Sequence, residues 1–244
     1  MISIVIPIYN AAPFLMRCVG SLQRFVSAPF QIILVDDGST DGSSQLCDQL
    51  AIADDRIVVV HQPNKGVSAA RNAGIAVAHG QWLWFVDADD YIVQEVPEPA
   101  EHATIVVMGC VWCENEQQTF MNASVNDIPY NTWRCIFRRD VIKRENLQFK
   151  VGRQYAEDQE FILKYTLADN EQQIEINSNY VYYYTIRKGS AITAENKKCK
   201  QLLDIVGVWF NVCCSAIRHK QICQKWILRE LKRLFKSFII TLVR

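Results

Sequence analysis

The sequence lacks the signals that would place the chain in a membrane. The formal net charge of its 244 residues is zero, and no apolar run approaches the roughly 20 residues that a spanning helix needs. The longest apolar run in the C-terminal part, residues 208–217, is interrupted by Asn211 and Ser215. The first residues enter a strand pattern with neither a basic segment nor a cleavable apolar segment, so we expect no leader peptide and no membrane crossing.

A disulfide framework is also missing, although the chain has nine cysteines. Cys110 and Cys113 form one C-x-x-C pair, but neither a second pair nor two histidines at zinc spacing accompany it. This favours buried free thiols over a metal or redox site. The absence of a framework and of a leader predicts a reducing, cytoplasmic location.

Two glycine-rich phosphate-binding motifs are absent. The turn after the first predicted strand, residues 9–13, contains no glycine, so it does not match the G-x-G-x-x-G turn of dinucleotide-binding proteins. The P-loop pattern, which ends in Gly-Lys-Ser/Thr, does not occur either. These absences argue against a dinucleotide-dependent oxidoreductase, which would share the alternation of strands and helices described next.

The chain has the composition of an ordinary globular protein, with 50% hydrophobic and 21% charged residues. Its length suits one large domain, or one domain with an appendage. Strands are predicted at residues 2–8, 31–35, 57–60 and 82–86, and helices at residues 14–25, 43–53 and 67–78. This alternation predicts an α/β fold with a doubly wound, mostly parallel sheet.

Acidic residues follow two of these predicted strands. Asp87, Asp89 and Asp90 come directly after the apolar run 82–86, and Asp36 and Asp37 end the second strand. Open α/β sheets bind ligands at the carboxyl ends of their strands, where two carboxylates can face one divalent cation that also holds a diphosphate. The alternative is an acidic turn whose side chains only cap backbone groups.

Four motifs occur in order between Val5 and Asp90, at residues 5–10, 35–43, 64–74 and 85–90. They resemble the successive motifs of family 2 glycosyltransferases. The resemblance implies a GT-A fold with a Rossmann-like nucleotide-binding half and C-terminal helices. It also implies an inverting transfer from a nucleotide-sugar, usually a UDP-sugar, with a divalent metal, Mn or Mg.

The same resemblance assigns roles to individual residues of these motifs. Lys65 and Arg71 are expected near the phosphates or sugar, although a solvated loop charge and a helix-surface salt bridge are the simpler alternatives. Asp87, Ala88 and Asp89 form the D-x-D motif, in which Asp89 is the safer metal ligand and Asp87 the second. The residues expected to contact the nucleotide are Pro7, Tyr9, Asn10, Asp36 and Asp37.

In the second half, Glu157 and Asp158 begin a predicted amphipathic helix. They coincide with the Glu-Asp motif of the family, in which the Asp is the catalytic base, so Asp158 takes that role and Glu157 contacts substrate. Acids also suit the dipole at the start of any helix, which is the structural alternative. Residues 187–190, after a predicted strand at 181–186, resemble a turn that closes over the diphosphate through Arg187 and Ser190, although an ordinary hairpin turn and Lys188 remain alternatives.

Positive charge is concentrated at the C-terminus. Residues 216–244 contain eight Lys and Arg residues against one acid, Glu230, so this tail is +7 and the remainder of the chain is −7. Its apolar residues follow helical spacing, with basic residues opposite. The tail is therefore either a core or oligomer helix, or a basic amphipathic helix on anionic lipid. No nucleic-acid partner is predicted, because no binding module accompanies the charge.

Together these features predict a GT-A catalytic domain over residues 1–195, with a nucleotide-sugar-binding half (1–90) and an acceptor-side half (91–195), followed by a helical tail (196–244). The predicted function is transfer of a hexosyl or N-acetylhexosaminyl group to a glycan or lipid-linked acceptor in cell-surface polysaccharide synthesis, at the cytoplasmic face of the membrane. The alternatives are a nucleotide-sugar-binding protein without turnover and a sugar nucleotidyltransferase. The latter should have a glycine-rich loop after the first strand, which residues 9–13 lack.

Overall fold

The computed structural model describes residues 1–96, 98–114, 116–124, 129–153, 155–169, 173–185 and 198–219, together with Lys232, Lys236 and Ile239. Arg187 and Ser190, which were predicted to contact the diphosphate, lie outside the described residues. So does most of the basic tail after residue 219.

The N-terminal half has the predicted alternation of strands and helices. Its elements are β1 (Ile2–Ile8), α1 (Ala12–Phe25), β2 (Phe30–Asp36), α2 (Ser43–Ala53), β3 (Ile57–His61), α3 (Val67–Val77) and β4 (Trp82–Phe85). The strands pair in parallel in the order β3-β2-β1-β4, with Val5 of β1 opposite Ile33 on one side and Phe85 on the other. All four strands therefore end at the same edge of the sheet.

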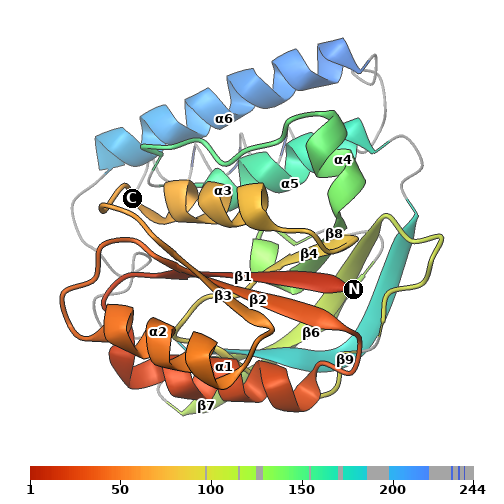
Figure 1. Ribbon diagram of the computed structural model, residues 1–244. Coiled ribbons are helices and arrows are strands. Elements are labelled where there is room, and N and C mark those ends of the chain that lie inside the picture. Colours follow the sequence, from red (N-terminus) through yellow and green to blue (C-terminus); the bar gives the residue numbers. More distant parts are fainter. Residues whose placement is uncertain are drawn as a thin grey trace.

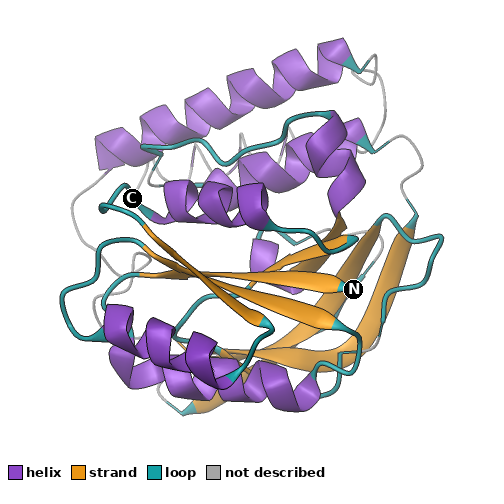
Figure 2. Cartoon of the chain, in the orientation of Figure 1, coloured by secondary structure: helices purple, strands orange, loops and turns teal. Residues whose placement is uncertain are grey.

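The second half extends this sheet with strands of both directions (Figure 2). Its elements are β5 (Tyr91–Ile92), β6 (Ile105–Glu114), β7 (Gln117–Met121), the 3₁₀ helix η1 (Thr132–Arg134), β8 (Cys135–Arg138), α4 (Arg139–Arg144), α5 (Glu157–Ala168), β9 (Ile174–Thr185) and α6 (Lys198–Arg218). The sheet continues as β4-β8-β6-β9-β5, and among these described strand pairs β6 and β9 are parallel while the others are antiparallel. The prediction of a mostly parallel sheet thus holds for the N-terminal half, whereas the second half is mixed.

Helices cover both faces of the sheet (Figure 1). α1 and α2 lie on one face, α3, α4 and α5 lie on the other, and α6 is outermost beyond α5. Strand residues alternate between the two cores: Ile4 and Ile6 of β1 face the core beside α1, and Val5 between them faces the core beside α3 and α5.

The outermost helix α6 is apolar on two faces. Its inner face, including Val208 and Val212, packs against Leu163 and Leu167 of α5. The opposite face exposes a stripe of large apolar residues, which we call the outer stripe: Leu203, Val206, Phe210 and Ile217. Residues Gln201–Arg218 have the length and composition of a membrane-crossing helix, contrary to the expectation that no segment would, but helices packed on a protein core also meet this criterion.

Candidate active site

The predicted site residues gather where the parallel strands end. Tyr9 and Asn10 follow β1, Asp36 ends β2, and Asp87 follows β4. Ala88, next to Asp87, is buried. Parallel neighbours bring these three strand ends to one edge of the sheet, which is where open α/β folds bind ligands.

Arg71 of α3 joins the two halves of the site. The helix lies against β1 at Gly74, where any side chain would collide with Val5, and Arg71 is one turn earlier. Its Nη1 donates to Oδ1 of Asp158 at 2.6 Å, and its Nη2 donates to Oδ1 of Asp87 at 3.2 Å. Nη1 is also 3.5 Å from Oε1 of Glu157. Asp87, Glu157 and Asp158, which come from distant segments, therefore surround the guanidinium of Arg71. Because Arg71 is buried, the alternative of a helix-surface salt bridge is wrong.

This Arg71 cluster carries more negative than positive charge, since three carboxylates share one guanidinium. Burial acts to lower the pKa of Arg71, but the carboxylates, Asp158 foremost, outweigh burial and raise it. Burial raises the pKa of Asp87, and the nearby charge of Asp158 adds to the effect. Burial and then Asp158 likewise raise the pKa of Glu157. An additional cation near the cluster would be stabilised by this excess of negative charge.

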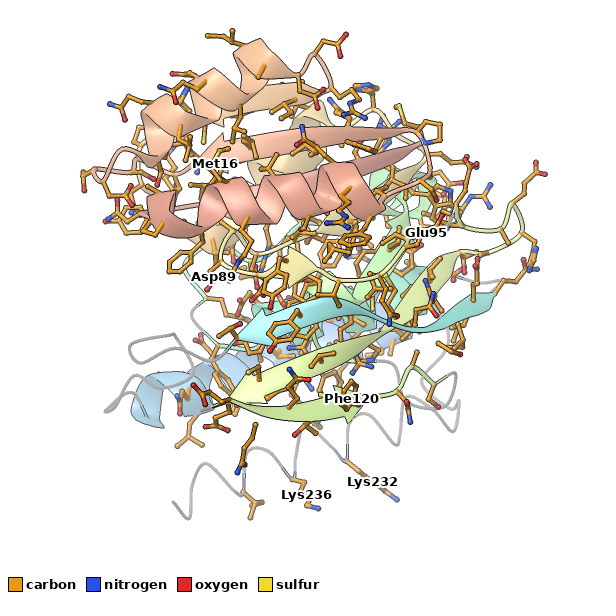
Figure 3. All side chains as sticks on the ribbon, turned by 90° about the horizontal axis from the view of Figure 1, so that it is seen from below. Met16, Asp89, Glu95, Phe120, Lys232 and Lys236 are labelled. Atoms are coloured by element: carbon orange, nitrogen blue, oxygen red, sulfur yellow. The ribbon has the colours of Figure 1, made fainter. Side chains whose placement is uncertain are left out.

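The carboxylates of the D-x-D motif have the chemistry of ligands for such a cation. Asp87 and Asp89 are hard oxygen donors at the end of β4, and Mg²⁺ is commonly held by one or two carboxylates plus substrate phosphates. Within the described residues, no group of three or more His, Cys, Asp or Glu side chains is arranged to hold a metal alone. Figure 3 shows Asp89 between α1 and the strands of the second half. The residues therefore fit a metal whose coordination is completed by a bound diphosphate.

Asp90, to which the sequence assigned no role of its own, ties the D-x-D loop to β9. It is buried, and its Oδ2 accepts a hydrogen bond from the Tyr182 hydroxyl at 2.8 Å. The same hydroxyl accepts a hydrogen bond from the backbone N–H of Asp87 at 3.0 Å. Burial, and after it the charge of Asp87, raises the pKa of Asp90 to about 8. Its position directly after the D-x-D motif was the only sequence signal.

Asp37 shapes the loop that leads into α3. Its Oδ1 accepts hydrogen bonds from Gln62 Nε2 at 2.6 Å and Lys65 N at 2.9 Å, and its Oδ2 accepts one from Gly66 N at 2.8 Å. Gly66 has a φ of 86°, a conformation that favours glycine. The side chain of Lys65 is left exposed beside this loop. The carboxylate of Asp37 thus already accepts three hydrogen bonds from the loop, and its contact with a base or ribose stays a prediction.

Asp36 is held by the neighbouring loop and strand. Its Oδ1 accepts from Ser39 N at 3.0 Å, and its Oδ2 lies 3.1 Å from His61 Nδ1. Burial acts to raise the pKa of Asp36, but the hydrogen bonds from Ser39 and His61 outweigh it and lower the pKa. Asp36 is therefore stabilised as a carboxylate at the end of β2.

The loops after β1 and β2 hold each other in place. Asn10 has a φ of 52°, and its Oδ1 accepts a hydrogen bond from Thr40 N at 2.8 Å. Asp41 Oδ2 in turn accepts one from Ala12 N at 3.1 Å, at the first residue of α1. Tyr9 is exposed beside them, and Pro7 is partly exposed. These contacts form a defined surface at the sheet edge where the nucleotide was predicted.

Comparison with known proteins shows which family the chain resembles. The model of the family described as glycosyl transferase family 2 matches residues 3–161. The chain is 33% identical over 189 residues to the uncharacterized glycosyltransferase EpsJ of Bacillus subtilis, an alignment that covers 67% of this chain and 55% of EpsJ. It is also 33% identical over 225 residues to the glycosyltransferase GlyG of Streptococcus pneumoniae, covering 80% of this chain and 74% of GlyG. The chain thus spans about half the length of EpsJ and about three quarters of GlyG.

A solved structure shares the fold. The crystal structure of S. aureus TarS 1-349 in complex with UDP-GlcNAc superposes with a TM-score of 0.72 and 22% sequence identity, covering 86% of this chain and 66% of that TarS fragment. At this identity the likeness shows the fold alone. The matched family and the shared fold together show that the chain belongs to glycosyl transferase family 2 and has the GT-A fold.

Proposed function

We propose that the protein is an inverting glycosyltransferase, with residues 1–195 as its catalytic domain. It would move a hexosyl or N-acetylhexosaminyl group from a nucleotide-sugar to a hydroxyl of a glycan or lipid-linked acceptor in cell-surface polysaccharide synthesis. The observation that carries the proposal is the Arg71 cluster, because it joins Asp87 of the donor motif to Asp158 of the predicted base motif. The UDP-GlcNAc complex of TarS supports a UDP-sugar as the donor.

Asp158 serves as the general base in this proposal. The acceptor oxygen forms a bond to the anomeric carbon, and the bond from that carbon to the diphosphate oxygen breaks. The hydroxyl proton passes to the Asp158 carboxylate, and the nucleoside diphosphate leaves. A positioned base contributes roughly 10²–10⁴-fold to such a step. Glu157, on the same turn of α5, would contact substrate.

The remaining site residues bind and orient the donor. Pro7, Tyr9 and Asn10 would line the nucleotide, and Asp36 with Asp37 would face the base or ribose. Lys65, Arg187 and Ser190 would lie along the phosphates. Arg71 would lie near the phosphates or sugar and would also orient Asp87 and Asp158, since its two terminal nitrogens donate to their carboxylates.

Asp89 and Asp87 would hold a divalent cation, Mn or Mg, against the diphosphate. When bound, the metal supplies neutralisation of the charge that develops on the leaving diphosphate. The excess negative charge of the Arg71 cluster supports a cation at this place.

The acceptor would be met at the cytoplasmic face of the membrane. The outer stripe of α6 is apolar and exposed, and basic residues follow it in the chain. Lys232 and Lys236 lie at the margin of the molecule beyond Phe120 of β7 (Figure 3). Exposed apolar residues and lysines both suit an anionic lipid surface. An oligomer contact through the same stripe is the alternative.

The test is turnover by the Asp158→Asn variant. The purified protein is incubated with manganese and UDP-glucose or UDP-N-acetylglucosamine, and released UDP is measured. Asp158→Asn should abolish UDP release while calorimetric affinity for UDP changes less than about twofold, because the amide keeps the shape but accepts no proton. A binding protein would release no UDP even as wild type, and a nucleotidyltransferase would instead form pyrophosphate from UTP and a sugar phosphate. A variant with wild-type turnover would remove Asp158 as the base.

A further inference from the structure

The carboxylate of Asp158 is held from two sides by different parts of the fold. Arg71 donates to Oδ1, as described above. Oδ2 accepts two hydrogen bonds from one residue, Thr132, whose backbone N–H lies at 3.2 Å and whose Oγ1 lies at 3.0 Å. With both oxygens bound, the carboxylate cannot rotate about its Cβ–Cγ bond without losing at least one of these contacts.

Thr132 is the first residue of η1, and this short helix is fixed to three strands. The carbonyl of Trp133 accepts a hydrogen bond from Trp84 Nε1 of β4 at 2.8 Å. The indole of Trp133 stacks on the Tyr182 ring of β9, with centroids 4.4 Å apart. Arg134 Nε donates to the carbonyl of Met108 in β6 at 3.1 Å. A single 3₁₀ turn has weak intrinsic stability, so these ties decide where Thr132 lies.

The side chain of Thr132 is fully buried and β-branched. Its χ1 rotation is therefore restricted by its own branching and by its neighbours. The hydroxyl is aimed at Asp158 before any substrate binds. Support of this kind, in which packed residues fix the rotamer of a reacting group, reduces the reorganisation needed in the transition state.

We propose that Thr132 is a positioning residue that orients Asp158 for proton abstraction from the acceptor. The inference rests on the proposed function, in which Asp158 is the base. Thr132 would not touch substrate; it would act through the carboxylate that it holds. Because the backbone N–H remains when the side chain is changed to Val or Ser, removal of the hydroxyl alone should misdirect Asp158 without freeing it completely.

The experiment compares Thr132→Val, which replaces the hydroxyl by a methyl group of similar size, with Thr132→Ser, which retains it. Thr166→Val is the matched control, since Thr166 is a buried threonine of α5 whose Oγ1 bonds to the Ile162 carbonyl instead. UDP release from UDP-glucose and UDP-N-acetylglucosamine gives kcat and the KM for donor. Calorimetry with UDP and manganese gives donor-site affinity, and thermal unfolding reports the fold.

We expect Thr132→Val to lower kcat by about 10-fold or more, with donor KM and UDP affinity within about twofold. Thr132→Ser should restore most of the turnover, and Thr166→Val should match wild type. Wild-type turnover in Thr132→Val, while Asp158→Asn is inactive, would overturn the role of Thr132 and leave the proposed function standing. Turnover in Asp158→Asn would overturn both. A loss in Thr132→Val that Thr132→Ser shares, or that Thr166→Val shows equally, would assign Thr132 to the fold alone.

Discussion

Removal of the Arg71 guanidinium should destabilise the protein far more than removal of an exposed arginine. In Arg71→Met, Asp87, Glu157 and Asp158 would lose a cation that lies within 3.5 Å of all three. Breaking a buried ion pair by deleting one partner costs about 3–5 kcal/mol, because the remaining charge is uncompensated.

The structure favours the lower end of that range. In the variant, Asp158 keeps its two hydrogen bonds from Thr132. Glu157 loses little, because its contact with Nη1 of Arg71 is long, at 3.5 Å. The pKa values of Asp87 and Glu157 are already raised, so these groups can bind protons when Arg71 is lost. We therefore expect a loss of about 3 kcal/mol, or a melting temperature lower by about 6–12 °C.

The measurement is urea unfolding at pH 7, followed by the fluorescence of the six tryptophans in the presence of a chelator. The chelator prevents a divalent cation from replacing the lost charge. The control is Arg56→Met, which removes an ion pair with Asp54 in which the Arg56 side chain is 46% exposed. Solvent screens that pair, so its loss should cost less than about 1 kcal/mol. If Arg71→Met cost no more than Arg56→Met, the cluster would not stabilise the fold and the reasoning from burial would fail.

Three further predictions concern the metal, a histidine and the outermost helix. UDP binding measured by calorimetry should weaken at least about 10-fold when manganese is removed by chelator or when Asp89 is changed to Ala; equal affinity in all conditions would contradict the metal site. Hydrogen bonds that His61 donates to Asp36 and then to Asp48 raise its pKa above 6.5. The stabilising effect of protonated His61 should therefore be complete below pH 6.5 and should disappear as the pH rises through the raised pKa. His61→Gln should then lower the melting temperature at pH 5.5 but not at pH 9. Equal shifts of the melting temperature at the two pH values would refute this. Full-length protein should co-sediment with anionic liposomes at low salt but not with neutral ones. Phe210→Ser on the outer stripe should weaken the binding to anionic liposomes. If the protein does not bind liposomes but forms a dimer that Phe210→Ser dissociates, the stripe is an oligomer contact instead.

The sequence by itself determined the N-terminal half of the fold. The apolar runs of β1, β2 and β4 and the helices between them are local patterns, and short βαβ connections leave little choice of topology. The acids at the ends of β2 and β4 had to meet at one edge, because parallel strands end together. The family motifs between Val5 and Asp90 are also contiguous stretches of sequence, so they can be recognised without the structure.

The tertiary structure decided the second half of the sheet. β6 pairs in parallel with β9 and antiparallel with β8, although long segments separate these strands along the chain. No local pattern specifies such partners, since the direction in which a strand pairs depends on the segments it packs against in the folded chain. The mixed sheet was therefore not predictable from periodicity.

The same distinction holds at the site. Asp87 and Asp158 could be named from motifs, but their connection through Arg71 depends on how closely α3 lies against β1 and on where α5 begins. Thr132 carried no sequence signal, because it contacts Asp158 across 26 residues and acquires its position from the packing of Trp133. Local sequence determines which chemical groups are present at a strand end or helix start, whereas hydrogen bonds between distant segments exist only after the core has packed and set their distances.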